Sequence, residues 1–132
     1  MSLSVQIEKD FGSFQLNVAF EAGEETLALL GASGCGKSMT LRCIAGIVKP
    51  DKGRIVLNGE TLFDSEKGID LPPQKRRVGL LFQNYALFPN MTVEQNILAG
   101  MRRGSSRAQK QERLRAIIEK FCLQGLEKRR PA

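Results

Sequence analysis

The chain lacks the long apolar runs of a membrane-spanning protein: none of its apolar runs approaches the ~18 residues that a transmembrane helix needs. The first six residues lack the basic and apolar regions of a signal peptide. The chain has only three cysteines, and their odd number and irregular spacing favour reduced thiols over a disulfide framework. These absences predict a cytosolic protein, and a length of 132 residues predicts one domain or a piece of one.

The sequence also lacks a long run of basic residues, although the formal net charge is +6. The basic residues are scattered, with small clusters at 75–77, 102–103 and 128–130, and no aromatic residues are interleaved with them. The sequence has no recognisable nucleic-acid-binding motif. An anionic nucleotide or a charged protein surface explains the charge as well, so we expect no nucleic-acid partner.

One motif dominates what is present: residues 31–38 match the phosphate-binding pattern G-x-x-x-x-G-K-[ST] in full. Glycines let the backbone wrap so that successive N–H groups point at a phosphate, and the following helix adds its positive N-terminal end. Lys37 supplies a cation for the outer phosphates, and Ser38 supplies a hydroxyl for Mg²⁺. The predicted nucleotide-binding residues of this segment are Gly31, Ala32, Ser33, Gly34, Cys35, Gly36, Lys37, Ser38, Met39 and Thr40.

The context of the motif supports this interpretation over a chance glycine-rich turn. The apolar run 27–30 predicts a buried strand before the loop, and residues 39–45 predict a helix after it that ends at Gly46. Cys35 lies near the helix N-terminus and Lys37, which both favour a thiolate. A small residue that is merely tolerated in the loop is an equally good explanation of Cys35.

The remaining elements follow from apolar periodicity and turn residues. Residues 3–9 and 14–20 predict two strands, and the second alternates apolar and polar positions. Asn58-Gly59 predicts a hairpin turn between 54–57 and 61–63, and 78–82 predicts another buried strand. Thr92 opens a capping-box pattern for a helix over 93–99 that ends at Gly100. A last helix is expected from Ser105 or Ser106, with an apolar stripe of Leu114, Ile117, Ile118 and Phe121. Pro72-Pro73 is expected to open a short turn or helix. Together, these strands and helices predict the α/β fold class, with a phosphate loop.

The whole chain resembles the ATP-binding cassette of membrane transporters. The resemblance rests on the phosphate loop and on the segments 44–46, 50–55, 75–79, 82–83, 85–89, 91–93 and Asn96. It implies the N-terminal portion of a P-loop ATPase core: an antiparallel β subdomain, a strand–loop–helix unit and the start of a helical subdomain. Residues 1–90 correspond to the nucleotide-binding core with its glutamine loop, and residues 91–132 to the start of the helical subdomain. Within the family, residues 54–101 most resemble bacterial importers of oxyanions, molybdate in particular, although sulfate, iron and polyamine importers share much of this stretch.

The resemblance implies roles for residues outside the phosphate loop. Gln83 matches the glutamine that reaches Mg²⁺ and the attacking water, so that Lys37 and Gln83 are the implied catalytic residues, and Ser38 and Gln83 the implied metal ligands. Phe11 matches an aromatic residue that stacks on adenine. A core position for Phe11 or Phe14 is the alternative.

Residues 84–92 match the segment on which the coupling helix of the membrane permease docks, and Tyr85, Phe88 and Pro89 are the implied contact residues. Packing of these side chains into the protein is the alternative. The further implied partner is a second ATPase subunit, and the implied location is the cytoplasmic face of the membrane. ATP and Mg²⁺ are the implied cofactors.

The sequence departs from the family pattern at several points. Met39 stands where a threonine or serine usually reaches the α-phosphate, and one such lost hydrogen bond costs about 0.5–1.5 kcal/mol. The signature segment, the Walker B acidic strand and the switch histidine are absent from these 132 residues, which contain no histidine. We therefore expect part of a longer subunit that binds nucleotide without meaningful turnover alone.

Two other functions remain open: a non-catalytic regulatory module that binds nucleotide, and a soluble cassette protein that acts on nucleic acid or ribosomes. The segments 64–79 and 85–89 disfavour the second. If the strands 27–30 and 78–82 lack a neighbouring strand, their edges should be exposed, and self-association or partial disorder is expected.

Overall fold

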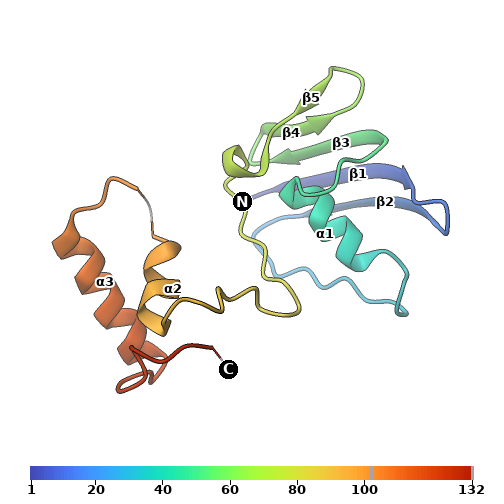
Figure 1. Ribbon diagram of the computed structural model, residues 1–132. Helices are drawn as coiled ribbons and strands as arrows, with labels where there is room; N and C mark the ends of the chain where they lie inside the picture. The colour runs from blue at the N-terminus through green and yellow to red at the C-terminus, as the bar shows by residue number, and fades with distance from the viewer. Residues whose placement is uncertain (102, 132) are drawn as a thin grey trace. The chain divides into compact units, whose positions relative to one another are not determined.

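Five antiparallel strands, one α-helix and one 3₁₀ turn make up the first of two units, Met1–Leu80, in the computed structural model (Figure 1). The structure describes residues 1–101 and 103–131; Arg102, which belongs to one predicted basic cluster, lies outside them, as does Ala132. The elements of this unit are β1 Leu3–Asp10, β2 Gln15–Ala22, α1 Lys37–Ala45, β3 Lys52–Leu57, β4 Glu60–Asp64, β5 Ile69–Asp70 and the 3₁₀ turn η1 Pro73–Lys75. The second unit, Leu81–Ala132, contains α2 Val93–Ala99 and α3 Arg107–Lys120. In the part of the chain that is described, no helix is both long and apolar enough to cross a membrane.

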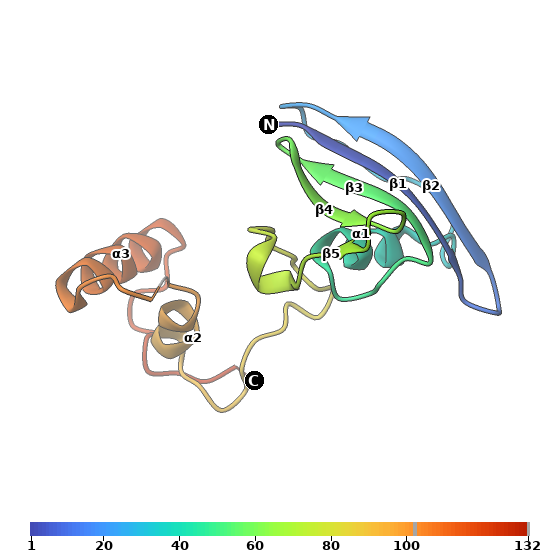
Figure 2. The ribbon, with the colours of Figure 1, turned by 90° about the horizontal axis from the view of Figure 1, so that it is seen from above.

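The sheet has the strand order β2-β1-β3-β4-β5, and each neighbouring pair is antiparallel. The β3–β4 hairpin turns at Asn58 and Gly59, whose φ angles are 51° and 79°, which confirms the predicted Asn-Gly turn. The short strand β5 was not predicted, because two residues carry no periodic pattern. Figure 2 shows that the sheet is curved and that α1 lies on its concave side.

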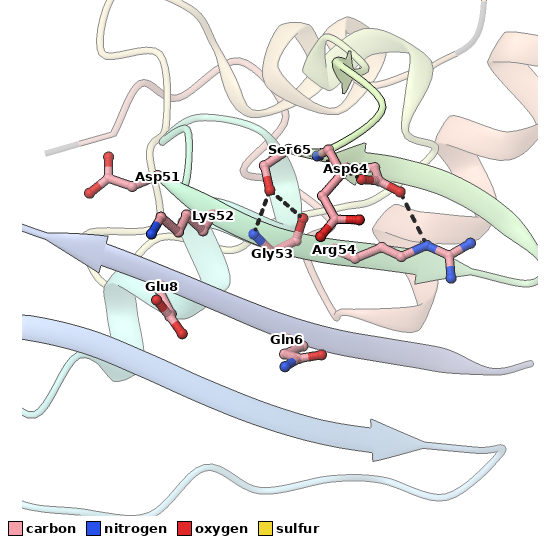
Figure 3. Close-up of a pocket in the computed structure, with 9 residues that line it drawn as sticks. Gln6, Glu8, Asp51, Lys52, Gly53, Arg54, Asp64 and Ser65 are labelled. Atoms are coloured by element: carbon pink, nitrogen blue, oxygen red, sulfur yellow. Dashed lines mark hydrogen bonds and ion pairs between the residues drawn. The ribbon is translucent and has the colours of Figure 1, made fainter.

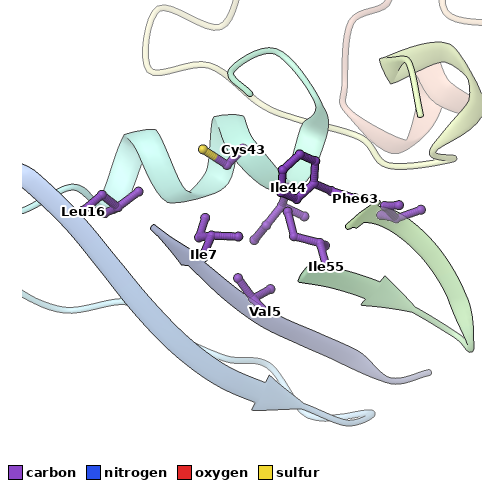
Figure 4. Packing of buried hydrophobic residues seen from close by; sticks show 8 residues of the cluster. Val5, Ile7, Leu16, Cys43, Ile44, Ile55 and Phe63 are labelled. Carbon is purple, nitrogen blue, oxygen red and sulfur yellow. The ribbon is translucent and has the colours of Figure 1, made fainter. Parts of the chain in front are cut away.

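The core of this unit lies between α1 and the sheet (Figure 4). Its buried members are Val5, Ile7, Leu16, Cys43, Ile44, Ile55, Leu62 and Phe63. The predicted alternation along 14–20 is confirmed, since Leu16 is buried and Val18 and Phe20 are partly buried while the residues between them are exposed. One face of the sheet is therefore apolar and covered, and the other is polar.

Two predicted buried strands are wrong. Neither 27–30 nor 78–82 forms a strand, and Leu30 and Leu81 are 91% and 76% exposed. A buried strand requires hydrogen-bonded neighbours on its edges. No strand within the described residues pairs with either segment, so the apolar runs do not become part of the sheet.

The helices of the second unit begin as their capping residues predict. Thr92 accepts a hydrogen bond from the Gln95 N–H at 3.2 Å, and Ser106 accepts one from the Gln109 N–H at 3.2 Å. Both are complete capping boxes, in which the glutamine side chain in turn accepts from the cap N–H. This confirms the helix over 93–99 and places the start of the last helix after Ser106.

The predicted apolar stripe of the last helix is confirmed only in part. Leu114 and Ile118 are buried and Ile117 is partly buried, but Phe121 is 63% exposed. The helix ends at Lys120, and Phe121 has non-helical backbone angles of φ −100° and ψ 11°. Its side chain therefore leaves the helical period that would have aligned it with the stripe.

Candidate functional site

The part of the phosphate loop that precedes helix α1, residues 31–36, requires glycine at two positions. Gly34 and Gly36 have φ angles of 83° and 97°, in the left-handed region that glycine adopts at low cost. Gly36 is also buried, and a Cβ at this position would lie 2.6 Å from Leu16 Cδ1 on β2. The loop is thus seated on the sheet at the point where it becomes helix α1.

The N-terminus of α1 is open to an anion. Gly36 caps the helix without a side-chain hydrogen bond, and the first turn has no acidic residue. The first N–H groups of a helix have no intrahelical partners and carry a partial positive charge. A phosphate group fits this combination of donors and charge.

Lys37 lies over its own loop. Its Nζ donates hydrogen bonds of 2.7 Å to the carbonyl oxygens of both Gly31 and Ala32. The Sγ of Cys35 is 3.4 Å from the same nitrogen, and a Cβ at Gly31 would lie 2.7 Å from that sulfur. The ammonium group is therefore held at the loop by oxygen acceptors, which phosphate oxygens can replace.

The side chains of the three residues after Lys37 differ in their exposure to solvent. Ser38 is exposed, whereas Met39 is partly buried and packs against the core. Thr40 is 2% exposed and donates its hydroxyl to the Gly36 carbonyl oxygen at 2.9 Å. The side chains of Met39 and Thr40 thus face the protein, so any contribution of these two residues to nucleotide binding comes from their backbone. The hydroxyl of Ser38 remains the predicted ligand for Mg²⁺.

The two phenylalanines of the β1–β2 turn lie next to the end of the phosphate loop. The rings of Phe11 and Phe14 stack with centroids 4.8 Å apart, and Lys9 Nζ is 5.5 Å from the Phe11 centroid. A Cβ at Gly36 would lie 3.4 Å from Phe14 Cε2. Both rings also pack against the core, so one face of Phe11 is already occupied. Stacking of adenine on Phe11 stays a prediction.

The predicted permease-contact residues belong to the second unit. Tyr85, Phe88 and Pro89 are all exposed, as are Gln83 and Leu87. Tyr85 and Ala86 have φ angles of 59° and 47°, which are costly for residues with a Cβ. The loop therefore displays its aromatic side chains to solvent. Its docking role and the catalytic role of Gln83 stay predictions.

Asn96 on α2 holds this loop, a function that the sequence does not reveal. Its Oδ1 accepts a hydrogen bond of 2.9 Å from the Phe88 N–H. Its Nδ2 donates to the carbonyl oxygens of Phe88, Met91 and Thr92 at 3.0–3.2 Å. The only signal in the sequence was its place in the family resemblance, which gave it no role. A single amide thus fixes the segment 88–92.

A hollow on the first unit lies elsewhere, on the polar face of the sheet (Figure 3). It has a volume of about 690 Å³ and is lined by Gln6, Glu8, Asp51, Lys52, Gly53, Arg54, Asp64, Ser65 and Glu66. Arg54 pairs with Asp64 at 3.5 Å, and Ser65 hydrogen-bonds to the Gly53 backbone. The hollow contains no residue of the phosphate loop, and within the described residues no cluster suited to a metal ion was found. The hollow is therefore separate from the predicted nucleotide site.

Comparison with curated proteins gives relatives along the full chain. The protein is 44% identical over 132 residues to the molybdate/tungstate import ATP-binding protein WtpC of Archaeoglobus fulgidus, covering all of this chain and 52% of that one. It is 42% identical over 130 residues to the molybdenum import ATP-binding protein ModC of Rhodospirillum rubrum, covering 98% of this chain and 35% of that one. The chain therefore spans about half of the first relative and about a third of the second.

Solved structures show the same fold. A dimeric ATP-binding cassette bound to ADP and Pi matches with a TM-score of 0.74 at 24% identity, over 99% of this chain and 62% of that one. A bacterial ABC exporter with ATP bound matches with a TM-score of 0.69 at 25% identity, over 98% of this chain and 23% of that one. The expected fold, the N-terminal portion of an ABC ATPase cassette, is confirmed. Residues 14–132 match the ABC transporter family, and the chain belongs to that family.

Proposed function

We propose that this chain is the nucleotide-binding part of the ATP-binding subunit of an importer for molybdate, tungstate or a related oxyanion. The observation that carries the proposal is the phosphate loop 31–38, with an uncapped helix N-terminus and the Lys37 ammonium beside it. The identity of 44% to a molybdate/tungstate import protein supports the choice of substrate. The whole subunit couples ATP binding and hydrolysis to transport, and these 132 residues contribute the binding of ATP.

The residues of the site have separate tasks in this proposal. The N–H groups of the loop and of the first turn of α1 bind the phosphates, and Lys37 exchanges its bonds to Gly31 and Ala32 for phosphate oxygens. The hydroxyl of Ser38 and the amide oxygen of Gln83 are hard oxygen donors of the kind that Mg²⁺ prefers. When bound, Mg²⁺ neutralises charge on the transferring phosphate. Phe11 supports the adenine ring.

Two protein partners follow from the same proposal. The exposed aromatic residues of the segment 84–92 receive the cytoplasmic helix of a membrane permease, since aromatic residues are enriched at protein interfaces. A second copy of the whole ATPase subunit completes each nucleotide site. The subunit therefore acts at the cytoplasmic face of the membrane, and no nucleic acid takes part.

The first test is the affinity of the 132-residue chain for MgATP, measured by isothermal titration calorimetry. Lys37→Ala should weaken binding by at least about tenfold, because a charge-assisted hydrogen bond contributes about 1.5–3 kcal/mol. Lys67→Ala removes an exposed lysine from the same unit and should leave the affinity unchanged. Equal affinities of the wild type and Lys37→Ala would overturn the proposal.

The second test separates import from a regulatory role. Lys37→Ala is placed in the chromosomal gene of the source organism, and cellular uptake of molybdate, sulfate and iron is measured. Loss of molybdate uptake alone is the expected result. If the chain binds MgATP but all three uptake rates are unchanged, the importer function is wrong and a regulatory nucleotide-binding module takes its place.

A further inference from the structure

Arg76 has an environment unlike that of the other two residues of the basic cluster 75–77. Lys75 and Arg77 are exposed, whereas Arg76 is 1% exposed. Its Nε donates to the Leu71 carbonyl oxygen at 2.7 Å, and its Nη2 contacts Asp70 Oδ1 at 2.8 Å. Its Nη1 donates to the carbonyl oxygens of Cys43 and Ile44 at 2.9 and 3.2 Å. We call this set of contacts the Arg76 clamp.

The clamp acts on the last turn of α1. Cys43 and Ile44 belong to that turn, where carbonyl oxygens carry partial negative charge; the Cys43 oxygen also accepts a hydrogen bond from the Gly46 N–H at 3.2 Å. A guanidinium group presents several N–H donors in a planar fork, so one side chain can satisfy both carbonyls and still reach Asp70. Lysine lacks this fork and cannot reproduce the arrangement.

The backbone of α1 is shaped to admit Arg76. Gly46, which ends the helix, has a φ of 83°, and a Cβ there would lie 2.6 Å from Arg76 Nε. Burial lowers the pKa of Arg76, and the adjacent Asp70 carboxylate opposes this effect. The site is therefore built around a charged guanidinium, with room, acceptors and a counter-ion supplied by two segments, 43–46 and 70–71.

We propose that Arg76 is a positioning residue for nucleotide binding: the clamp fixes the C-terminal turn of α1, and thereby orients the N-terminal turn that carries Lys37 and Ser38. Helix α1 has nine residues and is about 13 Å long, so fewer than three turns of continuous backbone hydrogen bonds join its two ends. A shift of the C-terminal turn of α1 therefore also moves its N-terminal turn. By linkage, a nucleotide bound at the phosphate loop stabilises the clamp in return. The inference rests on the proposed binding of MgATP.

The first experiment measures MgATP affinity by calorimetry at a temperature where circular dichroism shows every variant to be folded. Arg76→Met should weaken binding by at least about tenfold, and Arg76→Lys by about three- to tenfold. Asp70→Asn keeps an oxygen acceptor and should change the affinity by less than about threefold. Two controls should bind like the wild type: Lys75→Met removes a neighbouring exposed charge, and Val5→Ala destabilises the core, of which Cys43 and Ile44 are also members, without removing a contact of the clamp.

The second experiment follows hydrogen exchange with and without MgATP. In the wild type and in Val5→Ala, MgATP should slow exchange in residues 70–77 as well as in residues 33–40. In Arg76→Lys, protection of 70–77 should be lost while protection of 33–40 remains, a pattern that general destabilisation does not produce. Arg76→Lys also serves if Arg76→Met fails to fold.

The outcomes distinguish this inference from the proposed function. If Lys37→Ala loses MgATP but the Arg76 variants bind as tightly as Val5→Ala, the positioning role is wrong and the nucleotide site stands. If MgATP protects 70–77 equally in Arg76→Lys and the wild type, the transmission along α1 is also wrong. If Lys37→Ala binds like the wild type, the proposed function itself fails.

Discussion

The two units of the chain differ in charge and in core. Residues 1–80 contain ten basic and ten acidic residues, while residues 81–132 contain ten basic and four acidic ones, so the whole net charge of +6 belongs to the second unit. The first unit has a cluster of eight buried residues, several of them with no accessible surface. Among the described residues of the second, the buried apolar side chains are Leu114 and Ile118. The phosphate loop therefore belongs to the unit with the larger core. The exposed aromatic loop, residues 84–92, belongs to the unit with the smaller core.

This difference teaches where each unit obtains its stability. The first unit depends on burial of apolar surface, which is worth about 25 cal/mol per Å². The second unit has about fifty residues and buries little apolar surface. Its stability therefore depends more on local hydrogen bonds, such as the helix caps. The predictions below separate these two sources, beginning with the largest effect.

Removal of Phe63 should have the largest effect and should be confined to the first unit. Phe63 is fully buried on β4 in the core, and a Phe→Ala change in such a position costs about 3–5 kcal/mol. Hydrogen exchange followed by mass spectrometry should show loss of protection in β1 and β3 and unchanged protection in α3. Leu114→Ala is the matched change in the second unit and should do the opposite. Equal loss in both units for either variant would mean that they fold as one.

The features that could be predicted from the sequence are local ones. The Asn58-Gly59 turn, the capping box at Thr92 and the phosphate loop each depend on a few successive residues. The segments 27–30 and 78–82 were mispredicted because a strand also depends on partners far along the chain. Their apolar composition was observed correctly, but it could not show whether those partners were present.

The same distinction applies within the candidate site. The sequence predicts the need for glycine in the loop, but not that Gly36 rests on Leu16, which is distant in the chain. Arg76 was part of a basic cluster and of the segment 75–79 that carries the resemblance, but its burial was not predicted, because it depends on carbonyl groups more than thirty residues earlier. Asn96 was recognised only by resemblance, since its four hydrogen bonds depend on how the preceding loop folds back.

Loss of a helix cap should have the next largest effect and should be confined to the second unit. Thr92→Ala removes the acceptor for the Gln95 N–H and should destabilise α2 by about 1 kcal/mol. Amide exchange in α2 should become faster, while exchange in the sheet of the first unit should not change. Thr92→Ser keeps the acceptor and is the control; if it is as unstable as Thr92→Ala, the capping hydrogen bond is not the cause.

Relief of backbone strain in the aromatic loop should give a smaller effect of opposite sign. Ala86 has a φ of 47°, so Ala86→Gly should stabilise the second unit by less than about 1 kcal/mol. Ala99→Gly makes the same change at an exposed helical position, the last residue of α2, and should destabilise it by up to about 1 kcal/mol. The denaturation midpoint of α2, followed by amide NMR, measures both. A shift in the same direction for the two variants would contradict the positive φ at Ala86.

The smallest effect is a dependence on pH that belongs to the first unit. Asp51 accepts hydrogen bonds from the Asp10 N–H at 2.8 Å and from Lys9 Nζ at 3.3 Å, and these lower its pKa from the ordinary value of 3.8. Because the folded state favours the carboxylate, the stabilisation is complete above this value and is lost as the pH falls through the lower pKa of the folded state.

The urea midpoint of the first unit, followed on NMR signals of β1, should therefore decline between about pH 4 and pH 2 in the wild type. Asp51→Asn should lower the midpoint near neutral pH and reduce its decline in the acid range, because the amide does not titrate there. Glu60→Gln removes an exposed carboxylate from the same sheet and should leave the wild-type decline in place. If the urea midpoint of Asp51→Asn falls as steeply with pH as that of Glu60→Gln, the hydrogen bonds from β1 to Asp51 do not stabilise the sheet. The acid sensitivity of the first unit then has another source.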